Sequence, residues 1–115
     1  MDVVEFLNKK GAVPLLCELD TYGVRYSTLE ENLPVSVATF DVRRQQALEL
    51  DLIKVVGEQR GTAGGHVYAL TDEGLQVRDR LDEYDVAHTY QVYRFRKEEY
   101  DEKVERALDE FNQEE

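Results

Sequence analysis

Residues 25–71 read RYSTLEENLPVSVATFDVRRQQALELDLIKVVGEQRGTAGGHVYALT, and this stretch decides the fold. Near its start, residues 27–30, Ser-Thr-Leu-Glu, have the spacing of a capping box, which predicts a short helix over 27–32. The residues Leu-Pro-Val at 33–35 predict a turn, and Ser36 then caps a second helix over 37–50. The first half of the stretch therefore predicts two helices joined by a turn of a few residues.

The second half of the stretch changes from a helical to an extended pattern. Residues 52–58 and 66–71 are rich in β-branched and aromatic side chains, and the glycines of the loop 59–65 suit a hairpin tip. We therefore expect a small β-hairpin in a chain that is otherwise mainly α-helical, an α+β fold. Further helices are predicted over 2–9, 12–20 and 73–83, the last capped by Thr71 or Asp72.

The last segment, 85–115, has the most regular pattern in the chain. Its apolar and aromatic residues recur at alternating steps of four and three, with one lysine among them: Val86, Tyr90, Tyr93, Lys97, Tyr100, Val104, Ala107 and Phe111. This spacing is a heptad seam on a helix of roughly 28 residues, which would be about 40 Å long. So small a domain cannot bury such a stripe, and we expect the helix to pair with its own copy in a homodimer. The alternative is a helix that folds back over its own domain. The predicted division is a domain over 1–84 and a dimerisation helix over 85–115.

The charge of the chain is strongly negative but unevenly distributed. The formal net charge is -11, with 25 acidic and 14 basic residues. Residues 24–71 carry six acidic and five basic side chains, whereas residues 97–115 carry nine acidic and three basic ones. Such a composition is typical of a protein from a high-salt cytoplasm, where repulsion between carboxylates is screened. The alternative is an ordinary acidic protein.

Two motifs carry a family resemblance that covers about residues 12–84. Leu50-Asp51-Leu52-Ile53 stands where winged-helix transcriptional regulators of the MarR, HxlR and PadR type show Leu-x-Gly-Leu-Ile/Val. Residues 68–74, Tyr-Ala-Leu-Thr-Asp-Glu-Gly, match their Y-x-L-T-x-x-G motif. The resemblance implies a winged helix-turn-helix, and the acidic composition predicts a haloarchaeal source. It makes 37–50 the recognition helix, which enters the major groove of DNA, and 59–65 the wing at the minor groove.

The resemblance also implies which side chains contact DNA. Those on or beside the outward face of the helix over 37–50 are Ser36, Ala38, Thr39, Val42, Arg43, Gln45 and Gln46. The methyl groups of Ala38 and Val42 suit thymine, the glutamine amides suit adenine, and Arg43 suits guanine or phosphate. Arg60 at the wing tip is expected in the minor groove, and Arg25 and Lys54 at phosphates.

Two residues depart from the family pattern. At 100° per residue, Val37, Phe40, Ala47 and Leu48 share the inward face of this helix, and Arg44 lies among them. A guanidinium in that position needs a carboxylate or a carbonyl partner, so Arg44 is interpreted as structural. Asp51 replaces the usual glycine, and aspartate tolerates the left-handed backbone better than most residues.

Other kinds of chemistry have weak support in this sequence. Neither His66 nor His88 has ligand spacing around it, and the glycines of 61–65 lack the Lys-Ser/Thr ending of a phosphate loop, so we expect no metal, no cofactor and no enzyme. The single cysteine, Cys17, cannot form an internal disulfide, which fits the cytoplasm. No apolar run approaches the roughly 20 residues of a membrane-spanning helix, so no membrane partner is expected.

The combined prediction is a homodimeric, sequence-specific DNA-binding transcription regulator that works at high salt. Because long-range attraction to phosphate is screened there, its affinity is expected to rest on short-range contacts and to stay flat or rise with added KCl. The alternative is a winged-helix module that binds protein and not DNA, which the lack of a basic stripe favours. A third possibility, which can coexist with DNA binding, is a small-molecule effector sensed by the aromatic group Tyr84, Tyr90, Tyr93 and Phe95 near the dimer junction. The alternative is that these aromatic side chains serve packing.

Overall fold

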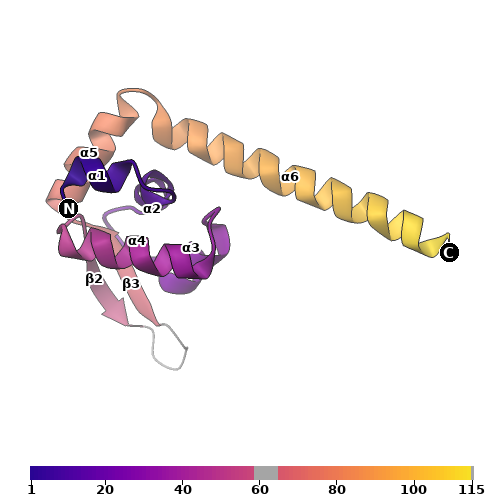
Figure 1. The fold of residues 1–115 in the computed structure, drawn as a ribbon, viewed down its shortest axis with the longest axis horizontal. Coiled ribbons are helices and arrows are strands. Elements are labelled where there is room, and N and C mark those ends of the chain that lie inside the picture. Colours follow the sequence, from indigo (N-terminus) through magenta and orange to yellow (C-terminus); the bar gives the residue numbers. More distant parts are fainter. Residues whose placement is uncertain (59–64, 115) are drawn as a thin grey trace.

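The computed structural model describes residues 1–58 and 65–114, and it is mainly helical with a small antiparallel sheet (Figure 1). In chain order the elements are α1 (Val3–Leu7), α2 (Ala12–Glu18), β1 (Val24–Arg25), α3 (Tyr26–Asn32), α4 (Val37–Glu49), β2 (Ile53–Glu58), β3 (His66–Leu70), α5 (Asp72–Asp82) and α6 (Val86–Gln113). The predicted mainly α-helical class with a small β element is confirmed.

The sheet has a third strand that the sequence did not predict. Its strand order is β1-β3-β2, and β3 pairs antiparallel with both neighbours. Val24 of β1 lies opposite Tyr68, which on its other side lies opposite Val55 of β2. The side chain of Asp20 accepts hydrogen bonds from the amides of Tyr22 and Gly23 and so forms the turn that leads into β1. A strand of two residues is too short to give an alternating pattern in a sequence.

The predicted capping box at Ser27 is wrong. Helix α3 begins at Tyr26, and its N-cap is Arg25, which makes no side-chain cap bond. Arg25 is held in extended backbone by its pairing with Val67 of β3, so the helix starts directly after the strand. Ser27 therefore lies inside the first turn. The two other predicted caps are confirmed, because Ser36 accepts from the amide of Thr39 and Thr71 from the amide of Gly74.

The hydrophobic core lies where α1 to α4 meet the sheet. Its least exposed large side chains are Phe6, Leu15, Leu16, Leu19, Leu29, Phe40, Leu52, Ile53 and Tyr68. Helix α4 contributes Phe40 and Ala47 to this core, as its inward face predicts, and Leu48 packs against it. Val37, which was expected on the same face, is instead half exposed. It is the first residue of α4, and the core is reached only one turn later, at Phe40.

One close junction joins α4, β2 and α5. Asp51, the second residue after the end of α4, has a left-handed backbone with φ 58°, as the sequence predicted. The Thr71 hydroxyl donates to the Asp51 carbonyl at 2.6 Å, and the Thr71 amide donates to the Leu52 carbonyl at 3.1 Å. Gly74 lies so close that a Cβ atom there would overlap the Leu52 carbonyl oxygen. We call these residues, Asp51, Leu52, Thr71 and Gly74, the α4–α5 junction.

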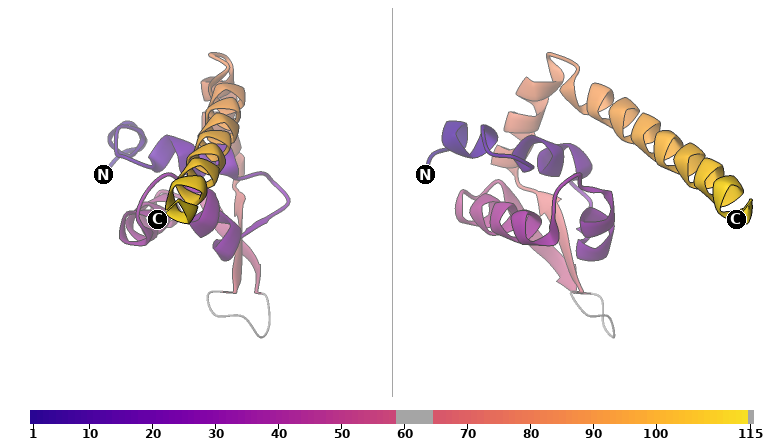
Figure 2. Two further views of the ribbon diagram at one scale, coloured as in Figure 1. Left: turned by 90° about the vertical axis from the view of Figure 1, so that its right-hand side faces the viewer. Right: turned by 45° about the vertical axis from the view of Figure 1, so that its right-hand side comes forward.

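Helix α6 lies against the other described elements over its first half. It packs against α2 and α5, and Ala87 is buried there. Every residue from Tyr100 to Glu114 is exposed, and this half projects away from the rest of the molecule (Figures 1 and 2). The alternative of a helix that folds back over its own domain therefore holds for the first half of α6 and not for the second.

The α4–α5 junction predicts an unusual effect of a helix-favouring substitution. Gly74→Ala should lower the free energy of unfolding by about 1–3 kcal/mol, because the added methyl must displace the Leu52 backbone. Helix propensity alone would give a gain of up to about 1 kcal/mol. Gly57→Ala is the matched control, since a Cβ atom at Gly57 meets only Val67 at 4.0 Å. Chemical denaturation measures the free energy of unfolding of both variants, and equal values would contradict the close packing of Gly74 against Leu52.

Candidate nucleic-acid interface

Helices α3 and α4 are joined by the short segment 33–36, which ends in a cap made by two hydroxyl groups. The Ser36 hydroxyl oxygen accepts from the Thr39 amide at 3.2 Å and donates to the Thr39 hydroxyl at 3.0 Å. Both side chains lie at the start of α4, where free backbone amides and the helix dipole favour an anion. The two predicted contact residues Ser36 and Thr39 thus lie together at the N-terminus of α4.

The side of α4 opposite the core is exposed along its length. Ala38, Val42, Gln45 and Glu49 follow one another on this side, which we call the outward face. The Val42 side chain is 50% exposed. The amide nitrogen of Gln45 donates to Glu49 at 3.4 Å, and this is a contact between neighbours on the same face. The outward face therefore offers methyl groups and an amide, with one carboxylate at its far end.

Arg43 does not lie free beside this face. Its Nε donates to the backbone carbonyl of Lys10 at 2.8 Å, and one terminal nitrogen donates to the Gln46 side-chain oxygen at 3.0 Å. Arg43 and Gln46 are half-buried and hold α4 against the loop between α1 and α2. For Arg43 to contact guanine or phosphate, as predicted, its hydrogen bonds to Lys10 and Gln46 would have to break. The Lys10 partner is 33 residues away in the chain, so no local pattern indicates it.

Arg44 has the structural role that the sequence predicted. Its guanidinium lies 3.5 Å from the Asp41 carboxylate and donates to the Tyr68 hydroxyl at 3.2 Å. It also lies over the rings of Tyr26 and Tyr68, at 5.6 and 5.7 Å from their centroids. The Tyr26 hydroxyl donates to Asp41 at 2.7 Å, and burial together with this hydrogen bond raises the pKa of Tyr26 to about 12. Arg44 thus joins α4 to α3 and the sheet.

The structure does not bring the other predicted DNA contacts together on one strand. Arg25 lies in β1 and Lys54 in β2, on opposite sides of β3, and both side chains are exposed. Arg60 and the wing loop 59–65 lie outside the described residues, apart from Gly65. The basic side chains of the described part therefore form no continuous stripe beside the outward face.

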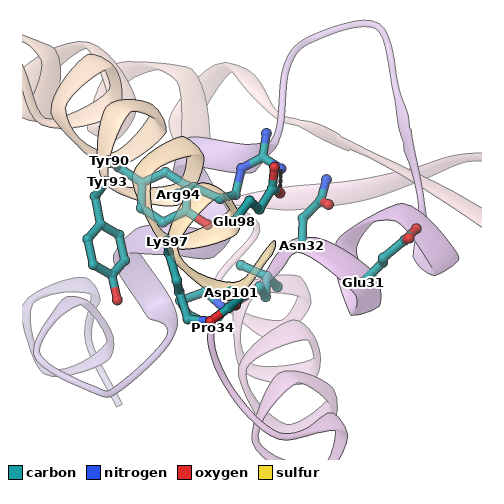
Figure 3. A pocket seen from close by; sticks show the side chains of 10 residues that line it. Glu31, Asn32, Pro34, Tyr90, Tyr93, Arg94, Lys97, Glu98 and Asp101 are labelled. Carbon is teal, nitrogen blue, oxygen red and sulfur yellow. Dashed lines mark hydrogen bonds and ion pairs between the residues drawn. The ribbon is translucent and has the colours of Figure 1, made fainter. Parts of the chain in front are cut away.

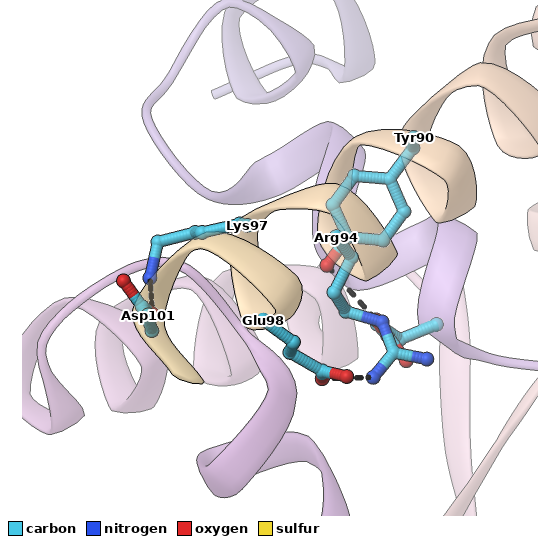
Figure 4. A network of polar contacts seen from close by, with 6 residues as sticks. Tyr90, Arg94, Lys97, Glu98 and Asp101 are labelled. Atoms are coloured by element: carbon cyan, nitrogen blue, oxygen red, sulfur yellow. Dashed lines mark hydrogen bonds and ion pairs between the residues drawn. The ribbon is translucent and has the colours of Figure 1, made fainter. Parts of the chain in front are cut away.

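The predicted dimer seam is divided between two environments. Near its start, the Tyr90 hydroxyl donates to the Glu18 carboxylate at 2.9 Å, and Arg94 lies 3.0 Å from the same carboxylate (Figure 4). Burial raises the pKa of the Tyr90 hydroxyl. We call Glu18, Tyr90 and Arg94 the Glu18 junction. Tyr90 was predicted to face a second copy, yet its hydroxyl is directed to its own domain, and Tyr93, Tyr100 and Phe111 remain exposed.

A small pocket lies under α6 beside the turn that precedes α4. It has a volume of about 160 Å³, with Glu31, Asn32 and Pro34 on one side and Tyr93 and Lys97 on the other (Figure 3). The Lys97 ammonium pairs with Asp101 at 3.2 Å on its own helix. Charged groups of both signs therefore line this pocket.

Within the described ranges, no group of three His, Cys, Asp or Glu side chains is arranged to hold a metal ion. None of the helices in the described part of the chain has the length and apolar character needed to cross a membrane.

Comparisons with protein-family models, with curated proteins and with solved structures gave no match to this chain. The resemblance to winged-helix regulators therefore stays a prediction that rests on the two motifs. The second motif has a physical reason in the contacts of its residues. The Tyr68 hydroxyl accepts from Arg44, the Thr71 hydroxyl donates to the Asp51 carbonyl, and Gly74 lies so close to Leu52 that no side chain fits there.

The Glu18 junction predicts how α6 is held to its domain. Glu18→Ala should lower the free energy of unfolding by about 1–3 kcal/mol, because Tyr90 and Arg94 both lose a carboxylate whose side chain is only 9% exposed. Glu98→Ala is the matched control, since Glu98 pairs with the same Arg94 but is 58% exposed. It should change stability by less than about 0.5 kcal/mol. Denaturation combined with hydrogen exchange over 86–98 measures both variants, and equal effects would contradict this role of Glu18.

Proposed function

We propose that this chain is a winged-helix transcription regulator that binds DNA as a homodimer, with α4 in the major groove. The order of elements supports the proposal, because α2, the short strand β1, α3, a turn and α4, followed by the hairpin of β2 and β3, is the order of a winged helix-turn-helix. In this assignment α4 is the recognition helix and 59–65 is the wing. The regulator acts in the cytoplasm, where its DNA lies.

The exposed outward face of α4 is the observation that carries the proposal. A helix fits the major groove, and its N-terminal residues come nearest to the bases. Ala38 and Val42 offer methyl groups for thymine, and Gln45 offers an amide for adenine. We assign Ser36 and the amides that begin α4 to a phosphate contact, because a helix N-terminus favours an anion. These contacts work at short range and need no net positive charge.

The charge of the chain fits this short-range mode of binding. In molar salt the Debye length is about 3 Å, so attraction between lysines and distant phosphates is largely lost. Glu49 on the outward face then carries little cost, because its repulsion is screened and a cation can bridge it to the DNA. We therefore assign the protein to a salt-adapted, haloarchaeal cytoplasm.

A second function has one specific observation in its favour. Arg43 is bound to the Lys10 carbonyl and the Gln46 side chain, and the one charge on the outward face is that of Glu49. A surface of this kind also suits a protein partner, which would make the chain a winged-helix interaction module. Selection of duplexes from a random-sequence pool distinguishes the two functions.

The proposed function predicts that a charge on α4 abolishes binding and that the same charge on α6 does not. Duplexes are first selected by the wild-type protein from a random-sequence pool in molar KCl, and their affinities are then measured by fluorescence anisotropy. Val42→Glu should weaken binding by at least about tenfold, or about 1.4 kcal/mol, because a carboxylate replaces a methyl contact against the groove.

Val92→Glu is the control, since Val92 on α6 is 46% exposed and Val42 is 50% exposed. Its affinity should stay within about twofold of the wild type, a difference of about 0.4 kcal/mol. Equal losses in the two variants would contradict the assignment of α4. If the wild-type protein selects no duplex at all, the proposal of DNA binding is wrong, and the winged-helix interaction module becomes the proposed function.

A further inference from the structure

The two halves of α6 carry opposite charge. Residues 86–97 contain three basic side chains, Arg94, Arg96 and Lys97, and no acidic one. Residues 98–113 contain seven acidic and two basic side chains, a net charge of -5. The first half lies against α2 and α5, whereas the second half extends into solvent (Figure 1). A helix of this kind complements a second copy that runs in the opposite direction.

The seam of α6 has an apolar surface that its own domain leaves open. Tyr93 is 54% exposed, Tyr100 67% and Phe111 66%. At 100° per residue these side chains lie along one side of the helix, about a third of a turn from the side where Ala87 and Arg94 meet the domain. A partner helix can therefore lie along these three side chains while Glu18 keeps its contacts with Tyr90 and Arg94.

We propose that two copies of α6 pair antiparallel along this seam, so that the acidic second half of each covers the basic first half of the other. The inference rests on the proposed homodimer and specifies its geometry. In an antiparallel pair, the two kinds of core position of the heptad lie opposite one another. One register then matches Val86 with the partner's Phe111, Tyr93 with the partner's Val104, and Lys97 with the partner's Tyr100. The same register brings the partner's Ala107 beside Tyr90, whose hydroxyl stays on Glu18.

Lys97 decides between the two directions. In a parallel pair each seam residue faces its own copy, so Lys97 would face Lys97 of the partner subunit inside the seam. Two ammonium groups there repel each other and lose hydration. In the antiparallel pair Lys97 lies beside an aromatic ring, the partner's Tyr100, which attracts a cation. The opposite charges of the two halves favour the same direction through pairs at contact distance, which salt screens less than distant charges.

Cysteine cross-linking tests the direction and the register. In the antiparallel pair Tyr93 faces the partner's Val104, whereas Val104 and its own copy are separated by 11 residues of helix, about 16 Å. A disulfide needs Cα atoms within about 7 Å of each other. Cys17 does not interfere, because it is buried and burial raises its thiol pKa to about 11. Both substituted positions are exposed, so the variants should fold, which circular dichroism checks.

The double variant Tyr93→Cys/Val104→Cys should migrate mostly as a disulfide-linked dimer after mild oxidation in high KCl. Each single variant should remain monomeric on the same non-reducing gel. A cross-linked dimer from Val104→Cys alone means a parallel pair and overturns the inference. The absence of a cross-link in the double variant also overturns the inference, whether light scattering finds a dimer or a monomer. DNA binding is measured separately, so its failure with the predicted cross-links would overturn the function and leave the antiparallel pair in place.

Discussion

The close approach of α5 to the end of α4 is the constraint on which the rest of the structure depends. Gly74 lies against the Leu52 carbonyl, and Thr71 binds the carbonyls of Asp51 and Leu52. These contacts fix where the chain leaves α4 and enters the sheet, and so they set the direction of α4 relative to β2 and β3. With α4 in this position, Phe40 and Ala47 reach the core, and the outward face is turned to solvent. The candidate interface is thus a consequence of packing on the far side of the helix.

Polar contacts of arginine then hold the surrounding elements in place. Arg43 binds the loop before α2, Arg44 joins α4 to α3 and the sheet, and Arg94 ties α6 to α2 through Glu18. Arg78 of α5 does the same for α2, because it donates to the carbonyls of Leu16 and Leu19 at 3.0 and 2.6 Å. The planar guanidinium, with several donors, suits such partly buried positions better than lysine does. Several arginines of this acidic chain therefore serve its architecture.

The sequence predicted those features that depend on neighbouring residues. The caps at Ser36 and Thr71, the left-handed backbone at Asp51 and the long final helix all follow from local rules. It failed where a distant partner decides. The capping box predicted at 27–30 does not form, because Arg25 pairs with Val67 and α3 starts directly after it. The side chain of Arg43 is held by the Lys10 carbonyl, which lies in another loop. The heptad pattern predicted α6 but could not indicate that Glu18 holds its first half.

The central claim is that an acidic chain binds DNA through the short-range contacts of one helix face. The measurement that tests it most directly is the affinity for a selected duplex, followed as the KCl concentration rises. The dissociation constant should stay nearly constant or fall, because counterion release contributes little and screening of the carboxylates weakens their repulsion from DNA. A steep, linear loss of affinity with the logarithm of salt concentration would mean that phosphate contacts dominate, and it would contradict the account.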